Sequence, residues 1–174
     1  KELGTNTILI KLSLGGNHMD ALGAVALSEV LTKNTTLRRL DLGFNRIGEA
    51  GVKALSEVLT KNTTLTWLDF VGNQIGEVGA KMVSEVLEKN TTLIHLDLMG
   101  NNLGVEGAQV LALCLGKNTA LAQLGLANNN ISARGTKAIS EALEKNTTLT
   151  ELNLAANEIG DAGTQELSRV LRRN

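Results

Sequence analysis

The chain has 174 residues, 43% of them hydrophobic, and is long enough to bury a sizeable core. Its 17 basic and 18 acidic residues give a net charge of -1, which argues against nucleic acid or an anionic membrane surface as the main partner. No apolar run approaches the roughly 20 residues of a membrane-spanning helix, and the single cysteine cannot form an internal disulfide, so we expect a cytoplasmic protein.

One sequence frame recurs along the whole chain. An asparagine returns with a strict period of 28 residues, at Asn17, Asn45, Asn73, Asn101, Asn129 and Asn157. Leucines precede each one at fixed offsets, and a glycine follows six residues later. Six copies fill the chain without insertion, which predicts one repeated strand, turn and helix.

Each copy is expected to open with a short strand. In the second copy, Leu40 and Leu42 are two residues apart and therefore point inward together, whereas residues 39, 41 and 43 point outward. Asn45 follows the strand and carries both a donor and an acceptor. Stacked asparagines are therefore expected to satisfy backbone groups where the chain turns.

A helix is predicted after each turn. Its start is marked by a residue of N-cap type in every copy: Asp20, Gly48, Gly76, Gly104, Ser132 and Gly160. In the second copy, Gly51, Leu55, Val58 and Leu59 form one buried stripe, and Gly51 is expected to allow close approach to neighbouring helices. Asn62 suits the helix end because asparagine tolerates the left-handed conformation. Lysine and glutamate four residues apart recur on the opposite side and predict a solvated convex face.

The frame LxxLxLxxNxI with a period of 28 resembles the leucine-rich repeat, and its full helix is similar to the ribonuclease-inhibitor subclass, shared with NOD-like receptors and Ran GTPase-activating proteins. The resemblance implies an α/β solenoid, a horseshoe segment of about six repeats with a parallel inner sheet and outer helices. We expect residues 1–174 to be a single leucine-rich-repeat domain of a longer chain. Glu166 and the following Arg169, Arg172 and Arg173 make the last helix polar, which suits a C-terminal end.

The outward strand positions differ between copies, whereas the frame hardly changes. One row across the predicted sheet reads Lys11, Arg39, Trp67, His95, Gln123 and Glu151, and the next reads Ser13, Asp41, Asp69, Asp97, Gly125 and Asn153. We interpret these rows as a concave surface that binds a protein partner. The predicted partner-binding residues are Arg39, Asp41, Phe44, Trp67, Asp69, Val71, His95, Asp97, Met99, Gln123 and Glu151.

Trp67 is the expected anchor of this surface. With Val71, Met99 and Phe44 it is predicted to form an exposed apolar patch, flanked by charge as binding hot spots are. Phe70, in contrast, replaces a frame leucine and is expected in the core. Neutral drift of exposed residues is the alternative interpretation, and aspartate is common in this row of such repeats.

No catalytic residue, metal site or cofactor is predicted. His18 and His95 are three repeats apart, and Cys114 takes a position that is valine in other copies, so it is expected in the core. Five glycosylation sequons start at Asn34, Asn62, Asn90, Asn130 and Asn146, four of which copy the repeat.

Two other functions remain open at this point. One is regulation of the Ran GTPase-activating type, although every copy has the same short spacing and no edge loop stands out. The other is a structural spacer or an engineered scaffold. The protein is expected to be a monomer or to associate weakly end to end through the first repeat, where Ile8 and Ile10 lie.

Overall fold

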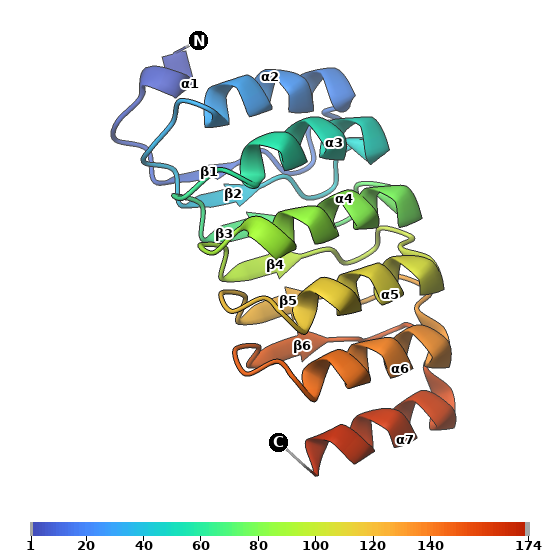
Figure 1. Cartoon of the computed structure of the whole chain (residues 1–174). Helices are drawn as coiled ribbons and strands as arrows, with labels where there is room; N and C mark the ends of the chain where they lie inside the picture. Colours follow the sequence, from blue (N-terminus) through green and yellow to red (C-terminus); the bar gives the residue numbers. More distant parts are fainter. Residues whose placement is uncertain (1, 173–174) are drawn as a thin grey trace.

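The computed structural model describes residues 2–172, with side chains from residue 4 onward. Strands and helices alternate along these residues (Figure 1): α1 Glu2–Thr5, β1 Lys11–Ser13, α2 Ala21–Leu31, β2 Arg39–Asp41, α3 Gly48–Leu59, β3 Trp67–Asp69, α4 Gly76–Lys89, β4 His95–Asp97, α5 Gly104–Leu115, β5 Gln123–Gly125, α6 Ser132–Leu143, β6 Glu151–Asn153 and α7 Gly160–Leu171.

The strands form one parallel sheet in chain order, β1 to β6. Each residue pairs with the residue 28 positions later, so Arg39 lies between Lys11 and Trp67, and Asp69 lies between Asp41 and Asp97. The predicted rows are therefore confirmed. Each strand has only three residues, so the alternation of inward and outward side chains is short.

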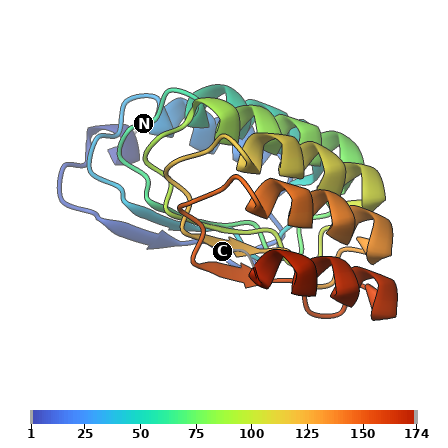
Figure 2. The ribbon, with the colours of Figure 1, turned by 60° about the horizontal axis from the view of Figure 1, so that its bottom comes forward.

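Helices and strands occupy separate layers, with one turn of chain stacked on the next (Figure 1, Figure 2). This is the α/β solenoid of about six repeats that the sequence predicts, and its sheet does not close. None of the described helices combines the length and apolar character needed to cross a membrane.

The hydrophobic core lies between the two layers. Leu40 and Leu42 of the strand side and Leu55 of the helix side are at most 1% exposed, and Phe70 is 2% exposed, as expected for a core residue. Gly51 allows close packing because a Cβ there would lie 3.0 Å from the Cβ of Ala24 in the preceding helix.

The predicted asparagine ladder is present and runs along the turns after the strands. The side chain of Asn101 shows one rung: its Oδ1 accepts from the N–H of Asn73 (2.9 Å), and its Nδ2 donates to the carbonyls of Phe70 (2.8 Å) and Leu98 (2.9 Å). Asn73, Asn101 and Asn129 have no exposed surface. From Asn45 onward, each asparagine of the ladder therefore joins its own turn to the preceding one.

The helix starts differ from the prediction. Asp20 is an N-cap, and its carboxylate accepts from the N–H groups of Leu22 and Gly23. The five equivalent residues are instead left-handed, with φ between 55° and 68°: Gly48, Gly76, Gly104, Ser132 and Gly160. The N-cap interpretation is wrong for the four glycines, whereas the hydroxyl of Ser132 accepts from the N–H of Arg134 (3.3 Å), as an N-cap side chain does. The N–H of Gly48 donates to the main-chain carbonyl of Asn73 in the next turn (3.0 Å), which explains the tight backbone there.

The helix ends also differ. Asn62 is not among the residues with positive φ, and the equivalent Asn90 is extended, with φ −79° and ψ 128°. The prediction of a left-handed asparagine is therefore wrong. The side chain of Asn90 instead donates to main-chain carbonyls of the preceding turn. In the last helix, Arg169 pairs with Glu144 (3.3 Å) and Glu166 (3.4 Å), whereas Arg173 lies outside the described residues.

Candidate protein-binding surface

The first row of the sheet face is a continuous stack of side chains. The guanidinium carbon of Arg39 lies 3.7 Å from the ring centroid of Trp67, and the imidazole of His95 stacks on the other face at 4.6 Å with an interplanar angle of 6°. Trp67 is therefore half-buried, with both ring faces covered. It presents an edge rather than an open aromatic face, which sequence alone could not show.

Hydrogen bonds extend this stack to the last strand. The carboxylate of Glu151 accepts from Nε2 of Gln123 (2.9 Å), so Oε1 of Gln123 faces His95, whose Nδ1 lies at 2.9 Å. Because an amide oxygen only accepts, Nδ1 of His95 carries a proton and donates. Glu151 thus orients Gln123, and Gln123 orients the imidazole that covers Trp67.

The second row consists mainly of aspartates that close local turns. Oδ1 of Asp41, Asp69 and Asp97 accepts the N–H of the residue two positions on, at 2.7–2.9 Å. Asn153 makes the same bond to Ala155 (3.0 Å). The row therefore has a structural role, independent of any partner.

Asp69, the middle aspartate of the row, lies where its charged form is electrostatically unfavourable. Burial raises the pKa of the Asp69 carboxyl, and repulsion from Asp97 and Asp41 adds to the increase. The hydrogen bond from the N–H of Val71 and the charge of His95 oppose it. The carboxylates thus lie close enough to repel each other in a partly desolvated setting.

The apolar residues of the predicted patch separate into exposed and buried members. Phe44 is 69% exposed and Met99 is 39% exposed, as expected, whereas Val71 is 9% exposed. Val71 is therefore not part of an exposed patch. The short side chain of Val71 packs closely against the preceding turn, where a Cβ built on Gly43 would lie 3.7 Å from the Cβ of Val71.

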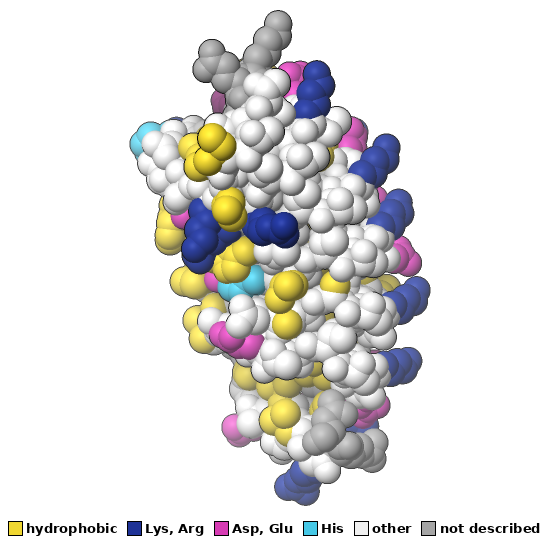
Figure 3. All heavy atoms as spheres, turned by 90° about the vertical axis from the view of Figure 1, so that its left-hand side faces the viewer, with side chains coloured by type: hydrophobic (Ala, Val, Ile, Leu, Met, Phe, Trp, Pro, Cys, Tyr) yellow, Lys and Arg dark blue, Asp and Glu magenta, His cyan; other side chains and the backbone are white. Residues whose placement is uncertain are grey.

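The backbone at Phe44 is left-handed. Its φ is 55°, in the left-handed region that bulky residues rarely adopt, and its ring lies against Gly72, where an added Cβ would be 3.1 Å from Cδ1. The equivalent residue of every other copy is also left-handed: Gly16, Gly72, Gly100, Asn128 and Ala156. This conformation therefore belongs to the repeated turn, and Phe44 is the one bulky side chain placed there. From the strand side, Figure 3 shows hydrophobic, basic and histidine side chains gathered together, with acidic groups beside them.

A second asparagine ladder was missed by the sequence analysis. It runs along the helix ends, through the asparagine of each KNTTL-like segment. In Asn90, Oδ1 accepts from the N–H of Leu93 (2.8 Å), and Nδ2 donates to the carbonyls of Leu59 (2.8 Å) and Asn62 (3.0 Å). The near identity of KNTTL in five copies was the available signal. Asn118 and Asn146 repeat the arrangement.

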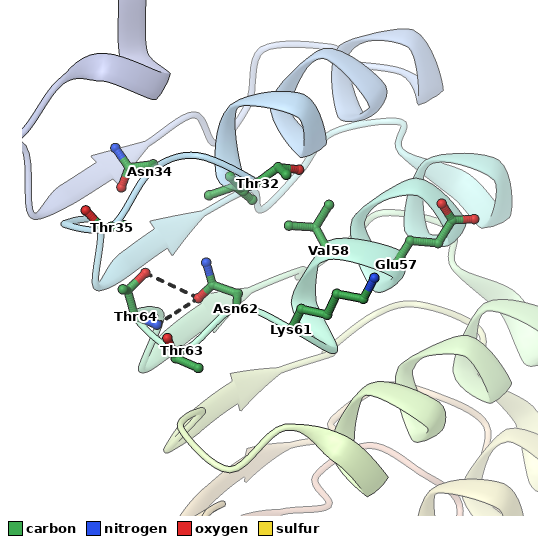
Figure 4. Close-up of a pocket in the computed structure, with 10 residues that line it drawn as sticks. Thr32, Asn34, Thr35, Glu57, Val58, Lys61, Asn62, Thr63 and Thr64 are labelled. Atoms are coloured by element: carbon green, nitrogen blue, oxygen red, sulfur yellow. Dashed lines mark hydrogen bonds between the residues drawn. The ribbon is translucent and has the colours of Figure 1, made fainter.

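This second ladder is interrupted at one joint. Within the described residues, Nδ2 of Asn62 makes no bond to the preceding turn, and the hydroxyl of Thr64 turns to Oδ1 of Asn62 (3.3 Å). The hydroxyl of Thr92 lies at the same distance from Oδ1 of Asn90 (3.3 Å), but it also reaches the carbonyl of Asn62 in the preceding turn (3.3 Å). A surface groove lies at this joint, lined by residues of the two neighbouring turns (Figure 4).

The other reactive side chains are placed as follows. Cys114 is buried and donates to the carbonyl of Leu111 (3.0 Å), and burial raises the pKa of its thiol to about 12. Among the described residues, no three His, Cys, Asp or Glu side chains are arranged to hold a metal ion. His18 is exposed and three turns from His95.

Comparison with protein families matches most of the chain. A family model described as Leucine Rich repeat matches residues 5–28, 33–56, 61–84, 89–112 and 145–168. These segments cover more than half of the chain and lie in five of its six copies. Among curated proteins, no match is found.

Two solved structures share the fold. The actin-binding site 2 of leiomodin-1 aligns with a TM-score of 0.62 and 19% identity, covering 99% of this chain and 87% of that one. The C-terminal domain of Caenorhabditis elegans tropomodulin aligns with a TM-score of 0.65 and 14% identity, covering 99% and 88%. At these identities, the similarity is one of architecture.

Proposed function

This chain belongs to the leucine-rich repeat family, and from that premise we propose that it is a non-catalytic scaffold that recognises a protein partner through its concave sheet face. The single observation that carries the proposal is the Arg39–Trp67–His95 stack beside the exposed Phe44. The helix face, in contrast, repeats the same lysine and glutamate pairs from copy to copy. Variation and aromatic side chains are concentrated where the sheet faces solvent.

The stack supports recognition because it is already ordered. Each side chain of the row contacts the next, from Arg39 to Glu151, so little conformational entropy remains to be lost on binding. Aromatic and arginine side chains dominate binding hot spots, and Phe44 supplies the exposed apolar area. Met99, Asp41, Asp69 and Asp97 border this centre.

One neighbour in structure suggests a first partner to test. The leiomodin-1 fragment is an actin-binding site, and it has the same architecture as this chain. Actin is therefore the first named candidate for the sheet face, as a hypothesis that rests on shared fold.

Further properties belong to the same proposal. The regular period of 28 residues supports membership of the ribonuclease-inhibitor-like subclass, as in NOD-like receptor repeats. We place the protein in the cytoplasm, as a single repeat domain of residues 1–174 within a longer chain. It acts as a monomer, or associates weakly end to end near the exposed Ile8 and Ile10, and binds neither nucleic acid nor membranes.

A capture experiment tests the proposal. The wild type and a Phe44→Ala/Trp67→Ala variant are immobilised and incubated first with purified actin and then with lysate, after circular dichroism shows equal folding. A Lys81→Ala/Glu85→Ala variant changes the helix face instead and is the matched control.

Loss of a specific partner in the sheet-face variant alone is the expected result. If the helix-face variant loses the partner and the sheet-face variant retains it, binding lies on the helices. If none of the three proteins retains a partner, the spacer interpretation is favoured.

A further inference from the structure

The groove at the interrupted joint of the second ladder has a hydrogen-bond donor and an acceptor that the chain itself does not use. In later copies, the amide of the helix-end asparagine donates to the carbonyl of the last leucine of the preceding helix, at 2.7–2.8 Å: Asn90 to Leu59, Asn118 to Leu87 and Asn146 to Leu115. Within the described residues, Nδ2 of Asn62 donates to no group, and the carbonyl of Leu31 accepts from none. Both residues line the groove, one from each turn (Figure 4).

The acceptor wall of the groove is the more buried of the two. Leu31 is 3% exposed, so water has little access to its carbonyl. A buried carbonyl without a partner is unfavourable, and a ligand that donates to it would remove this cost. Asn62 is partly exposed, whereas the bonded Asn90 and Asn118 are 5% and 8% exposed. A ligand can therefore enter past Asn62 and reach the carbonyl of Leu31.

Val58 adds an apolar surface to the same groove. It is partly exposed, whereas the equivalent residues of the four following helices are at most 7% exposed: Val86, Cys114, Ala142 and Val170. The groove has a volume of 420 Å³, far more than the about 30 Å³ that one water molecule occupies. It can therefore hold a ligand of residue size that combines polar and apolar groups.

We propose that this groove binds the main chain of an extended peptide segment. One peptide unit would donate its N–H to the carbonyl of Leu31 and accept at its carbonyl from Nδ2 of Asn62, and a short apolar side chain would lie against Val58. The site is separate from the sheet face and goes beyond the recognition proposed for that face.

The chemistry of the two walls favours this occupant. A trans peptide unit has its N–H and C=O on opposite sides, which matches an acceptor on one wall and a donor on the other. A carboxylate only accepts and an ammonium group only donates, so each would leave one wall without a partner. Recognition through main-chain hydrogen bonds is a common way for proteins to bind extended peptides.

An NMR titration of the ¹⁵N-labelled full chain with three probes tests the proposal. The capped peptide acetyl-Ala-Val-Ala-N-methylamide supplies complete peptide units, its fully N-methylated analogue lacks every N–H donor, and propionamide represents a side-chain amide. The test variant is Asn62→Asp, which keeps an oxygen for the N–H groups of Thr64 and Leu65 but removes the donor. Asn130→Asp adds the same charge at an exposed position of the fifth copy and is the control.

The capped peptide is expected to shift the N–H signals of Val58, Thr63 and Thr64, with a Kd on the order of 1 mM. N-methylation of the peptide and the Asn62→Asp substitution should each weaken binding about tenfold, since each removes one hydrogen bond, and Asn130→Asp should bind like wild type. Equal binding of the N-methylated peptide, or no shift in the groove with the capped peptide, would overturn the proposal. Propionamide that binds as tightly as the peptide would overturn the assignment to a main chain and indicate an asparagine or glutamine side chain.

Discussion

Removing one inner rung of the first asparagine ladder should cost far more stability than removing an outer one. In the Asn101→Ala variant, a fully buried amide loses hydrogen bonds to Asn73, Ile75, Phe70, Leu98 and Met99, at 2.8–3.3 Å. Stability is lost because these groups are buried and water cannot replace the missing hydrogen-bond partner.

The magnitude can be worked from the individual bonds. The buried N–H of Asn73 loses the acceptor Oδ1 of Asn101, which costs about 1–3 kcal/mol. The carbonyls of Phe70 and Leu98 each keep one bond from a neighbouring asparagine, so their losses cost about 0.5–1.5 kcal/mol each. The expected decrease in the free energy of unfolding is about 4 kcal/mol in total.

Asn17→Ala is the matched control, since Asn17 holds the same position in the first copy. Its side chain is exposed and, within the described residues, makes one hydrogen bond, to the carbonyl of Gly15 (3.1 Å). Urea unfolding followed by circular dichroism gives both free energies, and the control should lose less than about 1 kcal/mol. Equal losses in the two variants, or a loss below about 1 kcal/mol for Asn101→Ala, would refute the reasoning from buried hydrogen bonds.

Three further predictions concern single side chains. The pKa of Asp69 is raised in the folded state, so the folded protein binds this proton more tightly than the unfolded chain does. The contribution of this carboxyl to the free energy of unfolding therefore falls as pH rises from the ordinary aspartate range. In Asp69→Asn the decline in urea-unfolding free energy across acidic pH should be shallower, and an unchanged profile would contradict it. Cys114, with a thiol pKa of about 12, should react slowly with a disulfide reagent at neutral pH and completely after denaturation, and rapid reaction of the folded protein would show that the thiol is accessible. Phe44→Gly should keep the free energy of unfolding within about 1 kcal/mol of wild type, because relief of the left-handed strain offsets the lost contacts, whereas Phe70→Ala in the core should cost about 3–5 kcal/mol by the same assay. Similar losses in the two variants would mean that the Phe44 ring is packed rather than exposed.

The period of the sequence was sufficient to predict the fold, because every turn must bury the same leucines against its neighbours. It also predicted which residues share a row, since a shift of 28 positions relates all the strands. Asn45 and its equivalents could be assigned to a ladder because an isolated buried amide is unfavourable and only stacking satisfies it.

The geometry within the sheet face could not be predicted in the same way. Whether Trp67 is open or covered depends on side-chain distances, and Arg39 and His95 cover it only because neighbouring strands lie close together. The exposure of Val71 was misjudged because its short side chain is covered by neighbouring groups, whereas the longer side chain of Met99 in the same row remains exposed. The second ladder was missed because the recurring KNTTL segment can also be explained as a repeated helix end, without bonds between turns.

The interrupted rung between Asn34 and Asn62 has a mechanical consequence. It lies in the joint that connects the turn of β2 to the turn of β3, and the Arg39–Trp67 contact spans the same joint at the start of these strands. A repeat stack bends most readily where adjacent turns share the fewest bonds. Bending there would change the distance between the guanidinium and the indole. The fluorescence emission of Trp67, the single tryptophan, should therefore report changes in the curvature of the solenoid.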